Sequence, residues 1–432
     1  MGIFVDKKLN LGTKLLMVAV PLVIIFFLGY SLATAHISAQ LSAENFYEGI
    51  IVGGVDVSGK SKTEAIDIIY EKLKNDEQSV NISVYCEDQS ITLTNQNFAY
   101  KYNVEDVVNS AYACARNGNL FSRYFELLSI KNNADKFPVD AALDPESLGI
   151  TVDFVICKFD DPNLEAHVES FNPTCEPMFV YSEGKDGYKL NRDEVLQQIN
   201  GLASAQKSGE VRLQKREYKN NTTIDDAKAR TQLIGEFKTI STNNNNSNQN
   251  MKLSMEAING TVLQPFETFS FNKIVGDSND PKKGFLPGAS ILNGSIVMSY
   301  GGGICQAATT IYGAAIRSDM TIIERKNHRF KSSYVPYGLD ATIDYKTIDL
   351  KFRNDFTHPV YIQTAMVGKE LVCRIFGPKN QNFDAIEVNS WVTAREGEEI
   401  KAEAERVYYK GNKIINKKKL PNSVYKPKQH AA

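Results

Sequence analysis

The feature that most constrains this 432-residue chain is an uncharged run near its N-terminus, Leu15–Ala35. A membrane-spanning helix needs about 20 predominantly apolar residues, and this run is long enough. Lys7, Lys8 and Lys14 precede it, and positive flanks stay on the cytoplasmic side of a membrane. We therefore expect a cytoplasmic segment at 1–14, a single-pass anchor at 15–35 and an extracytoplasmic bulk that faces the cell wall.

A cleaved signal peptide is the alternative for this run. Ala33-Thr34-Ala35 has the small-x-small form of a cleavage site. The run is longer than the apolar region of about 7–15 residues that is usual in signal peptides, which favours the uncleaved anchor. Both interpretations export the protein.

The charge balance disfavours a polyanionic partner. There are 49 Lys and Arg against 51 Asp and Glu, so the chain has no overall basic field and we expect no nucleic-acid function. The histidines are isolated, and neither a C-x-x-C nor an H-E-x-x-H pattern is present, so we expect no metal. Six scattered cysteines suggest free thiols, with a disulfide between Cys157 and Cys175 left open.

The pattern after the anchor predicts an α+β fold in several parts. In 50–225, short alternating runs and helical patterns recur, including a helix start with Ser61 and Glu64 at capping-box spacing, so we expect one or two α+β modules. The Asn-rich stretch Ser241–Asn250 is expected to be a solvated loop. A mixed α/β domain follows at 239–379. The charged, β-rich extension 380–432 contains a hairpin around Gly411 and Asn412.

The motif "SYGGGICQAATTIYGAA" (Ser299–Ala315) places Cys305 at the start of an Ala-rich helical pattern. A helix N-terminus lowers the pKa of a thiol, and only the thiolate is a good nucleophile. Gly302 and Gly303, with the first helical N–H groups such as that of Gln306, are expected to hold a developing oxyanion. The alternative is a structural role, since unpaired cysteine is often buried and glycine often marks close packing.

A general base is expected downstream. His328 follows an expected strand at Met320–Ile323, and imidazole is well suited to take a thiol proton near neutral pH. His358 competes with it but precedes a proline and suits a turn. A carboxylate would fix the imidazole tautomer, and Asp340 and Asp344 both remain candidates.

Arg325 lies three residues before His328. A guanidinium at that place could clamp a substrate carboxylate through two hydrogen bonds, although an ordinary salt bridge is the more frequent use of arginine.

Several ordered blocks resemble the VanW domain family. They are "AINGTVLQPFETFSFNKIVG", "GGGICQAATTIYGAAI", "IIERKNHRF", "YVPYGLDATIDY" and "DLKFRNDFTHPV", which together span roughly 239–379. The upstream blocks "VGGVDVSGKSKTEA" and "SEGKDGYKLNRDEV" resemble a peptidoglycan-binding domain that precedes VanW and L,D-transpeptidase domains.

Similarity to VanW-type L,D-transpeptidases implies a cysteine enzyme that forms 3–3 cross-links between peptidoglycan peptide stems without a cofactor. Two other functions remain open, a non-catalytic wall-binding or glycopeptide-resistance accessory protein and a cysteine peptidase that trims stems. The resemblance implies catalytic roles for Cys305 and His328, oxyanion contacts from Gly302, Gly303 and the first helical N–H groups, and a substrate contact from Arg325. Asp340 is our candidate for the third catalytic residue, Gln306 for the helical N–H donor and Tyr337 for a second substrate contact.

Overall fold

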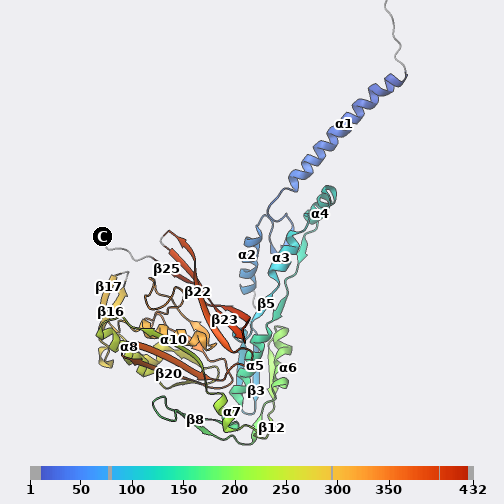
Figure 1. Ribbon diagram of the computed structural model, residues 1–432. Coiled ribbons are helices and arrows are strands. Elements are labelled where there is room, and N and C mark those ends of the chain that lie inside the picture. Colours follow the sequence, from blue (N-terminus) through green and yellow to red (C-terminus); the bar gives the residue numbers. More distant parts are fainter. Residues whose placement is uncertain (1–10, 76–79, 293–294, 398, 427–432) are drawn as a thin grey trace, which may run out of the picture. The chain divides into compact units, whose positions relative to one another are not determined.

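The computed structural model describes residues 11–75, 80–292, 295–397 and 399–426 (Figure 1). The N-terminal part of the expected cytoplasmic segment, 1–10, and the last residues, 427–432, lie outside that range. The chain forms two compact units. Unit 1 comprises Met1–Val84, Thr92–Leu148 and Gln198–Val211, and unit 2 comprises Tyr85–Ile91, Gly149–Gln197 and Arg212–Ala432. The expected region 50–225 therefore contributes residues to both units.

Unit 1 begins with the long helix α1 (Leu11–Gln40). Its segment Val20–Gln40 is long and apolar enough to cross a membrane, a test that a signal sequence also passes. Past the expected span, Ile37 and Leu41 are only 7% and 6% exposed because they enter the apolar core of unit 1. The helix is thus continuous with the folded part of this unit.

The remaining elements of unit 1 surround that core. Strand β1 pairs with β2 in antiparallel fashion and with β6 in parallel, and β5 pairs with β7. The capping box at the start of α2 is confirmed, since the Ser61 N–H donates to Glu64 at 2.8 Å. The bounds are β1 (Ile50–Val52), β2 (Val55–Asp56), α2 (Lys62–Asn75), η1 (Asn95–Asn97), β5 (Tyr100–Tyr102), α3 (Val104–Tyr112), α4 (Leu120–Asn132), β6 (Asp135–Phe137) and β7 (Ala141–Leu143).

Five elements lie where the chain passes between the units. They are β3 (Asn81–Cys86), β4 (Gln89–Thr94), α5 (Pro145–Phe159), α6 (Arg192–Ser204) and β11 (Gly209–Leu213).

Unit 2 is built on an antiparallel sheet of order β13-β21-β20-β14. Helix α10 packs against β13 and β21, while α8 packs against β20 and against α10. Every residue of α10 from Gln306 to Ile316 is buried, which explains its small and apolar composition. The bounds are β13 (Gln232–Ile240), α8 (Asn245–Ile258), β14 (Thr261–Leu263), α10 (Cys305–Arg317), β20 (Val360–Val367) and β21 (Glu370–Gly377).

The expectation of a solvated loop at Ser241–Asn250 is wrong, because α8 begins inside this Asn-rich stretch. The Asn244 side chain caps the helix by accepting a hydrogen bond from the Ser247 N–H at 2.9 Å. Asn250 is fully buried. Its amide donates to the carbonyls of Leu286 and Gly302 at 2.8 and 3.0 Å, and its oxygen accepts from the Leu286 N–H at 2.7 Å. Buried asparagine is stable here because tertiary acceptors and donors satisfy it.

Smaller strand pairs complete unit 2. The hairpin β16-β17 precedes α10 in the sequence, the sheet β15-β19-β18 has strands on both sides of α10, and β8 pairs with β9. The bounds are η2 (Pro162–Leu164), β8 (His167–Phe171), β9 (Phe179–Ser182), β10 (Gly187–Lys189), β12 (Arg216–Tyr218), α7 (Ile224–Ala229), β15 (Thr268–Ser270), α9 (Phe271–Val275), η3 (Pro281–Lys283), β16 (Pro287–Leu292), β17 (Ser295–Tyr300), β18 (Thr321–Glu324) and β19 (Lys351–Arg353).

The C-terminal extension is a sheet of β22 (Ala385–Glu396), β23 (Glu399–Lys410), β24 (Lys413–Lys419) and β25 (Ser423–Tyr425). The expected hairpin is confirmed, since Lys410 pairs with Lys413 across a turn in which Gly411 has φ of +57°. Strand β25 returns along β23 and pairs Ile400 with Tyr425. This return brings the end of the described chain back to the α/β part of unit 2.

Candidate functional site

The glycine turn before α10 is packed too tightly for any side chain. A Cβ on Gly302 would lie 2.3 Å from the backbone of Gly288, and one on Gly303, where φ is +100°, would lie 2.7 Å from Ser247. Only glycine fits the close packing at these positions and also adopts the positive φ of residue 303 without strain. The turn therefore fixes where α10 begins, and with it the position of Cys305.

Cys305 is the first residue of α10 and remains partly accessible to solvent. Its Sγ lies 3.4 Å from the Thr342 hydroxyl oxygen and 3.6 Å from the Ile343 carbonyl oxygen. The helix N-terminus contributes partial positive charge at this sulfur. Cys305 thus lies at the helix start that the sequence predicted, beside the segment that follows Asp340.

Cys305 and His328 are 23 residues apart in the sequence, and two contacts with the segment after Asp340 bring them close together. After α10 the chain turns into β18, whose end leads directly to His328. Lys326 then forms an isolated bridge with Thr342, in which the Thr342 N–H donates to the Lys326 carbonyl at 2.8 Å. The Thr309 hydroxyl ties α10 to the same segment by donating to the Ala341 carbonyl at 3.0 Å. Helix, histidine and carboxylate therefore meet at one place.

Asp340, rather than Asp344, is the carboxylate that contacts His328. Oδ2 of Asp340 lies 2.6 Å from Nδ1 of His328 and accepts the His328 backbone N–H at 2.7 Å. Because a carboxylate only accepts, Nδ1 carries a proton and Nε2 is left to exchange one with the thiol. Asp344 instead contacts Thr347 and Ile348 in the following turn.

The pKa values in this group shift in the directions that an ion pair requires. Burial raises the pKa of Cys305, but hydrogen bonding and charge from His328 outweigh it, so the thiol pKa lies below its usual value. Burial lowers the pKa of His328, yet hydrogen bonds with Asp340 and Cys305 raise it to about 10. Burial likewise raises the pKa of Asp340, and His328 holds it below the ordinary value. The arrangement favours thiolate and imidazolium.

The other oxygen of Asp340 is held by residues that sequence reasoning missed. The Tyr425 hydroxyl donates to Oδ1 of Asp340 at 2.5 Å and accepts the Gly338 N–H at 2.7 Å. Tyr425 and Ser423 are each 1% exposed. Tyr334, half-buried, places its ring 6.4 Å from the His328 ring. The segment "YVPYGLD" marks Tyr334 in the sequence, whereas no local pattern marks Tyr425.

Arg325 is turned inward instead of toward a substrate. Its side chain is 1% exposed and pairs with Asp340 at 3.4 Å. It donates to the carbonyls of Asp340 and Gly338 at 2.7 and 3.0 Å and to the Ser423 hydroxyl at 2.7 Å. The guanidinium is thus occupied in holding the loop that carries Asp340. Tyr337 is half-buried, with its ring 5.1 Å from that of Tyr425.

Two backbone N–H groups that the sequence predicted as oxyanion donors, those of Gly302 and Gln306, already form hydrogen bonds within the protein. The Gly302 N–H donates to Ser299 at 3.1 Å and the Gln306 N–H to Gly303 at 3.0 Å, so both are occupied by the turn itself. The Gln306 side chain is also buried, donating to Thr239 at 3.1 Å. Within the described residues, the N–H groups of Gly303 and Cys305 donate to no other residue. These two amides belong to partly accessible residues at the start of α10.

The remaining sequence candidates lie elsewhere. Cys157 and Cys175 are both free, so they form no disulfide with each other. His358 contacts Glu165 at 3.6 Å. The histidine that hydrogen-bonds with Cys305 is His328.

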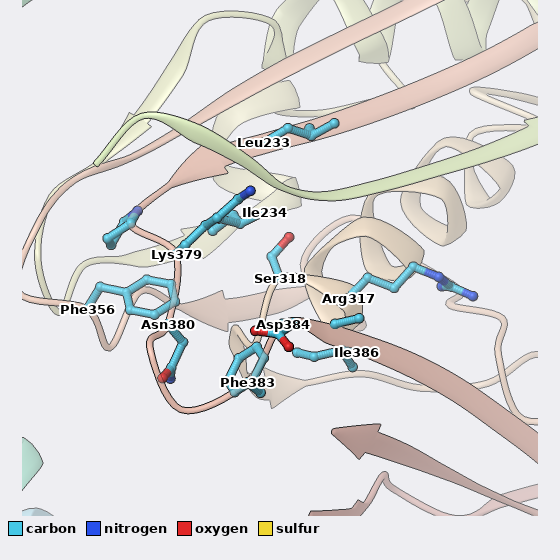
Figure 2. Close-up of a pocket in the computed structure, with 12 residues that line it drawn as sticks. Leu233, Ile234, Arg317, Ser318, Phe356, Lys379, Asn380, Phe383, Asp384 and Ile386 are labelled. Carbon is cyan, nitrogen blue, oxygen red and sulfur yellow. The ribbon is translucent and has the colours of Figure 1, made fainter. Parts of the chain in front are cut away.

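A cavity of about 200 Å³ lies at the opposite end of α10 (Figure 2). Its lining includes Arg317 and Ser318 at the helix C-terminus, with Phe356 and Phe383. At 1.5 Å per residue this end of α10 is roughly 18 Å from Cys305. None of the expected site residues lines this cavity, so it is separate from the group of residues around Cys305.

Two protein families match the chain. Residues 246–376, which include the glycine turn, Cys305, His328 and Asp340, match the family described as "VanW like protein". The chain contains a VanW-like domain. Residues 91–212 match the family described as "Putative peptidoglycan binding domain". The VanW-like domain ends before β22, so Tyr425 and Ser423 lie outside it. Together the two domains support a role associated with the cell wall.

Two relatives share parts of the sequence. The uncharacterized protein YoaR of Bacillus subtilis is 30% identical over 197 residues, covering 45% of this chain and 64% of that protein. The vancomycin B-type resistance protein VanW of Enterococcus faecalis is 33% identical over 137 residues, covering 30% of this chain and 49% of that protein. Each match thus spans less than two thirds of the relative. No solved structure matches the chain with significance.

Proposed function

We propose that this chain is a membrane-anchored L,D-transpeptidase that forms 3–3 cross-links in peptidoglycan through an acyl-enzyme at Cys305. The observation that carries the proposal is the alignment of Cys305, His328 and Asp340 at the start of α10, with the His328–Asp340 contact at 2.6 Å. This is the nucleophile–base–carboxylate arrangement of acyl transfer. The peptidoglycan-binding domain upstream gives the enzyme its polymeric substrate.

The first half of the reaction forms the acyl-enzyme. The Cys305 thiolate attacks the carbonyl that joins the L-centre of the third stem residue to D-Ala. The amides of Gly303 and Cys305 stabilise the oxyanion. The C–N bond then breaks, and the D-Ala amine leaves with the proton that His328 holds.

The second half transfers the acyl group. The side-chain amine of the third residue on another stem attacks the thioester and gives its proton to His328. Collapse of the intermediate forms the new amide and releases the Cys305 thiolate. Asp340 holds Nδ1 of the imidazole throughout, so Nε2 serves as base and acid in turn.

The test uses full-length protein in detergent and purified disaccharide-tetrapeptides, with products identified by mass spectrometry. We expect 3–3 cross-linked dimers and free D-Ala from the wild type and neither from Cys305→Ala. Cys175→Ala removes an exposed thiol and is the matched control, which should keep full activity. Release of D-Ala without dimers would instead indicate a hydrolase that uses water as acceptor. Dimers from Cys305→Ala would refute the proposal.

The anchor is part of the same proposal. Helix α1 continues without a break from its apolar segment into the core of unit 1, so we propose that it is retained as a single-pass anchor. The intact mass of the membrane-bound protein tests this directly. A mature protein that begins after Ala35 would show that α1 is a signal sequence.

A further inference from the structure

Helix α4 carries a second apolar stripe that the protein core does not cover. One side of the helix is buried, with Leu127 and Ile130 each 1% exposed. On another side, Phe121 and Phe125 follow each other at a spacing of four residues and are 42% and 67% exposed. Neighbouring exposed aromatic side chains of this size mark an interaction surface.

The exposed stripe lies beside the apolar part of α1. The ring of Phe121 is 6.4 Å from the ring of Tyr30, measured between centroids. Both helices belong to unit 1, and Figure 1 shows α4 next to the C-terminal half of α1. Ile37 and Leu41 hold the C-terminal end of α1 in the apolar core of unit 1. This packing fixes which residues of α1 lie beside the other elements of unit 1.

Helix geometry then gives the depth of Phe121 in a membrane. Tyr30 precedes Ala35, the end of the expected span, by five residues, which corresponds to about 7 Å along the helix axis. A residue in contact with Tyr30 therefore lies near or below the outer edge of the hydrocarbon layer. Aromatic side chains concentrate at this level of a bilayer.

We propose that α4 lies in the outer surface of the membrane, with Phe121 and Phe125 inserted into the lipid of the outer leaflet. The proposal rests on the anchor at α1 and is independent of the chemistry at Cys305. The contact is apolar, because the nearby cations are engaged within the protein. Arg123 donates to the Ala115 carbonyl at 3.0 Å, and Lys131 lies 3.7 Å from Glu48.

The experiment places a fluorescent reporter on the stripe of the full-length protein in phosphatidylcholine vesicles. The chain has one tryptophan, so Trp391→Phe gives a dark background. Phe125→Trp is then compared with Tyr70→Trp, a position on α2 of unit 1 that is 39% exposed. Brominated phosphatidylcholine quenches only tryptophan that touches lipid. We expect the brominated lipid to quench roughly half or more of the emission at position 125 and little of the emission at position 70. This result is expected because the apolar face of an interfacial helix is buried about 5–10 Å into the boundary between headgroups and acyl chains.

Phe121→Trp is a second reporter on the same stripe, should Phe125→Trp fail to fold. Unquenched emission at both positions would overturn the proposal. Blue-shifted but unquenched emission would also overturn it, because a protein partner or a second copy would then cover the stripe. Anionic phosphatidylglycerol should leave the quenching unchanged. Intact mass separates a failure of the anchor from a failure of the lipid contact, since loss of α1 removes residues up to Ala35.

Discussion

The hydroxyl of Tyr425 donates a 2.5 Å hydrogen bond to Asp340, which lies 85 residues earlier in the chain. Strand β25 delivers this tyrosine by pairing with β23, outside residues 246–376 of the VanW-like domain. The carboxylate that orients His328 is therefore itself oriented by the C-terminal extension. In an acyl-transfer site, such outer contacts hold the base in the geometry that the reaction needs.

Replacing Tyr425 with phenylalanine is expected to loosen the candidate site without unfolding the protein. Asp340 loses its shortest contact on Oδ1, and the Gly338 N–H loses its acceptor. Leaving buried groups unpaired costs about 1–3 kcal/mol, so urea unfolding should shift by that amount. With His328 held less firmly, we expect iodoacetamide to label Cys305 about threefold to tenfold more slowly at pH 7. Tyr409→Phe, which removes an exposed bond to Glu387, is the control. Equal labelling of the two variants would show that Tyr425 has no positioning role.

Removing the imidazole should move the pH dependence of Cys305 reactivity upward. His328 lowers the thiol pKa against the effect of burial, so the wild type carries thiolate at a lower pH than an ordinary cysteine. In His328→Ala the effect of burial is opposed only by the smaller effects of the Ile343 and Thr342 hydrogen bonds, so the rise in alkylation rate should shift to higher pH. Since each pKa unit changes the thiolate fraction tenfold, we expect about a tenfold loss or more at pH 7. The measurement is alkylation rate against pH in a Cys175→Ala background. His358→Ala should behave like the wild type, and superimposed profiles for all three proteins would contradict the ion pair.

Local patterns were sufficient to predict the elements that carry the candidate catalytic residues. Apolar residues at helical spacing after Cys305 predicted α10, and the short apolar run before His328 predicted β18. The position of His328 within the glycine-rich module favoured it over His358. Sequence could not choose between Asp340 and Asp344, because the choice depends on the bridge between Lys326 and Thr342.

Tertiary contacts determine three features that local sequence patterns do not show. The run before Asn250 has the composition of a loop, yet α8 starts there because Asn250 finds buried partners at Leu286 and Gly302. Arg325 has the chemistry of a substrate clamp, but its donors are taken by Gly338, Asp340 and Ser423. Which amides remain free for an oxyanion depends on hydrogen bonds inside the glycine turn, and no sequence pattern records them.

The pair of His328 and Asp340 should make the stability of unit 2 depend on pH in both directions. The pKa of Asp340 is lowered by folding, so its contribution is present above the unfolded value of about 4 and is lost as the pH falls. The pKa of His328 is raised to about 10, so its contribution is complete below the unfolded value and is lost as the pH rises toward 10.

Urea unfolding followed by the fluorescence of Trp391, which lies in β22 of unit 2, measures this dependence. The difference in free energy of unfolding between wild type and His328→Gln should shrink steadily from pH 6 to pH 10. The difference between wild type and Asp340→Asn should shrink as the pH falls below 4. A difference that stays constant across either window would mean that the residue stabilises unit 2 only by packing.

Asn250 is expected to stabilise the glycine turn that precedes Cys305. Asn250→Ala leaves the buried Gly302 carbonyl and the part-buried backbone groups of Leu286 without the partner that the fully buried Asn250 provides. We expect unfolding to be easier by about 2–4 kcal/mol, in the upper range for loss of a buried network. Because the turn positions Cys305, labelling of the thiol should slow even at temperatures where the variant is fully folded. Asn246→Ala removes a single exposed bond to Pro287 from the same helix and should change both quantities little. If the two variants were equally stable and equally reactive, the amide of Asn250 would not be what holds the turn that precedes Cys305.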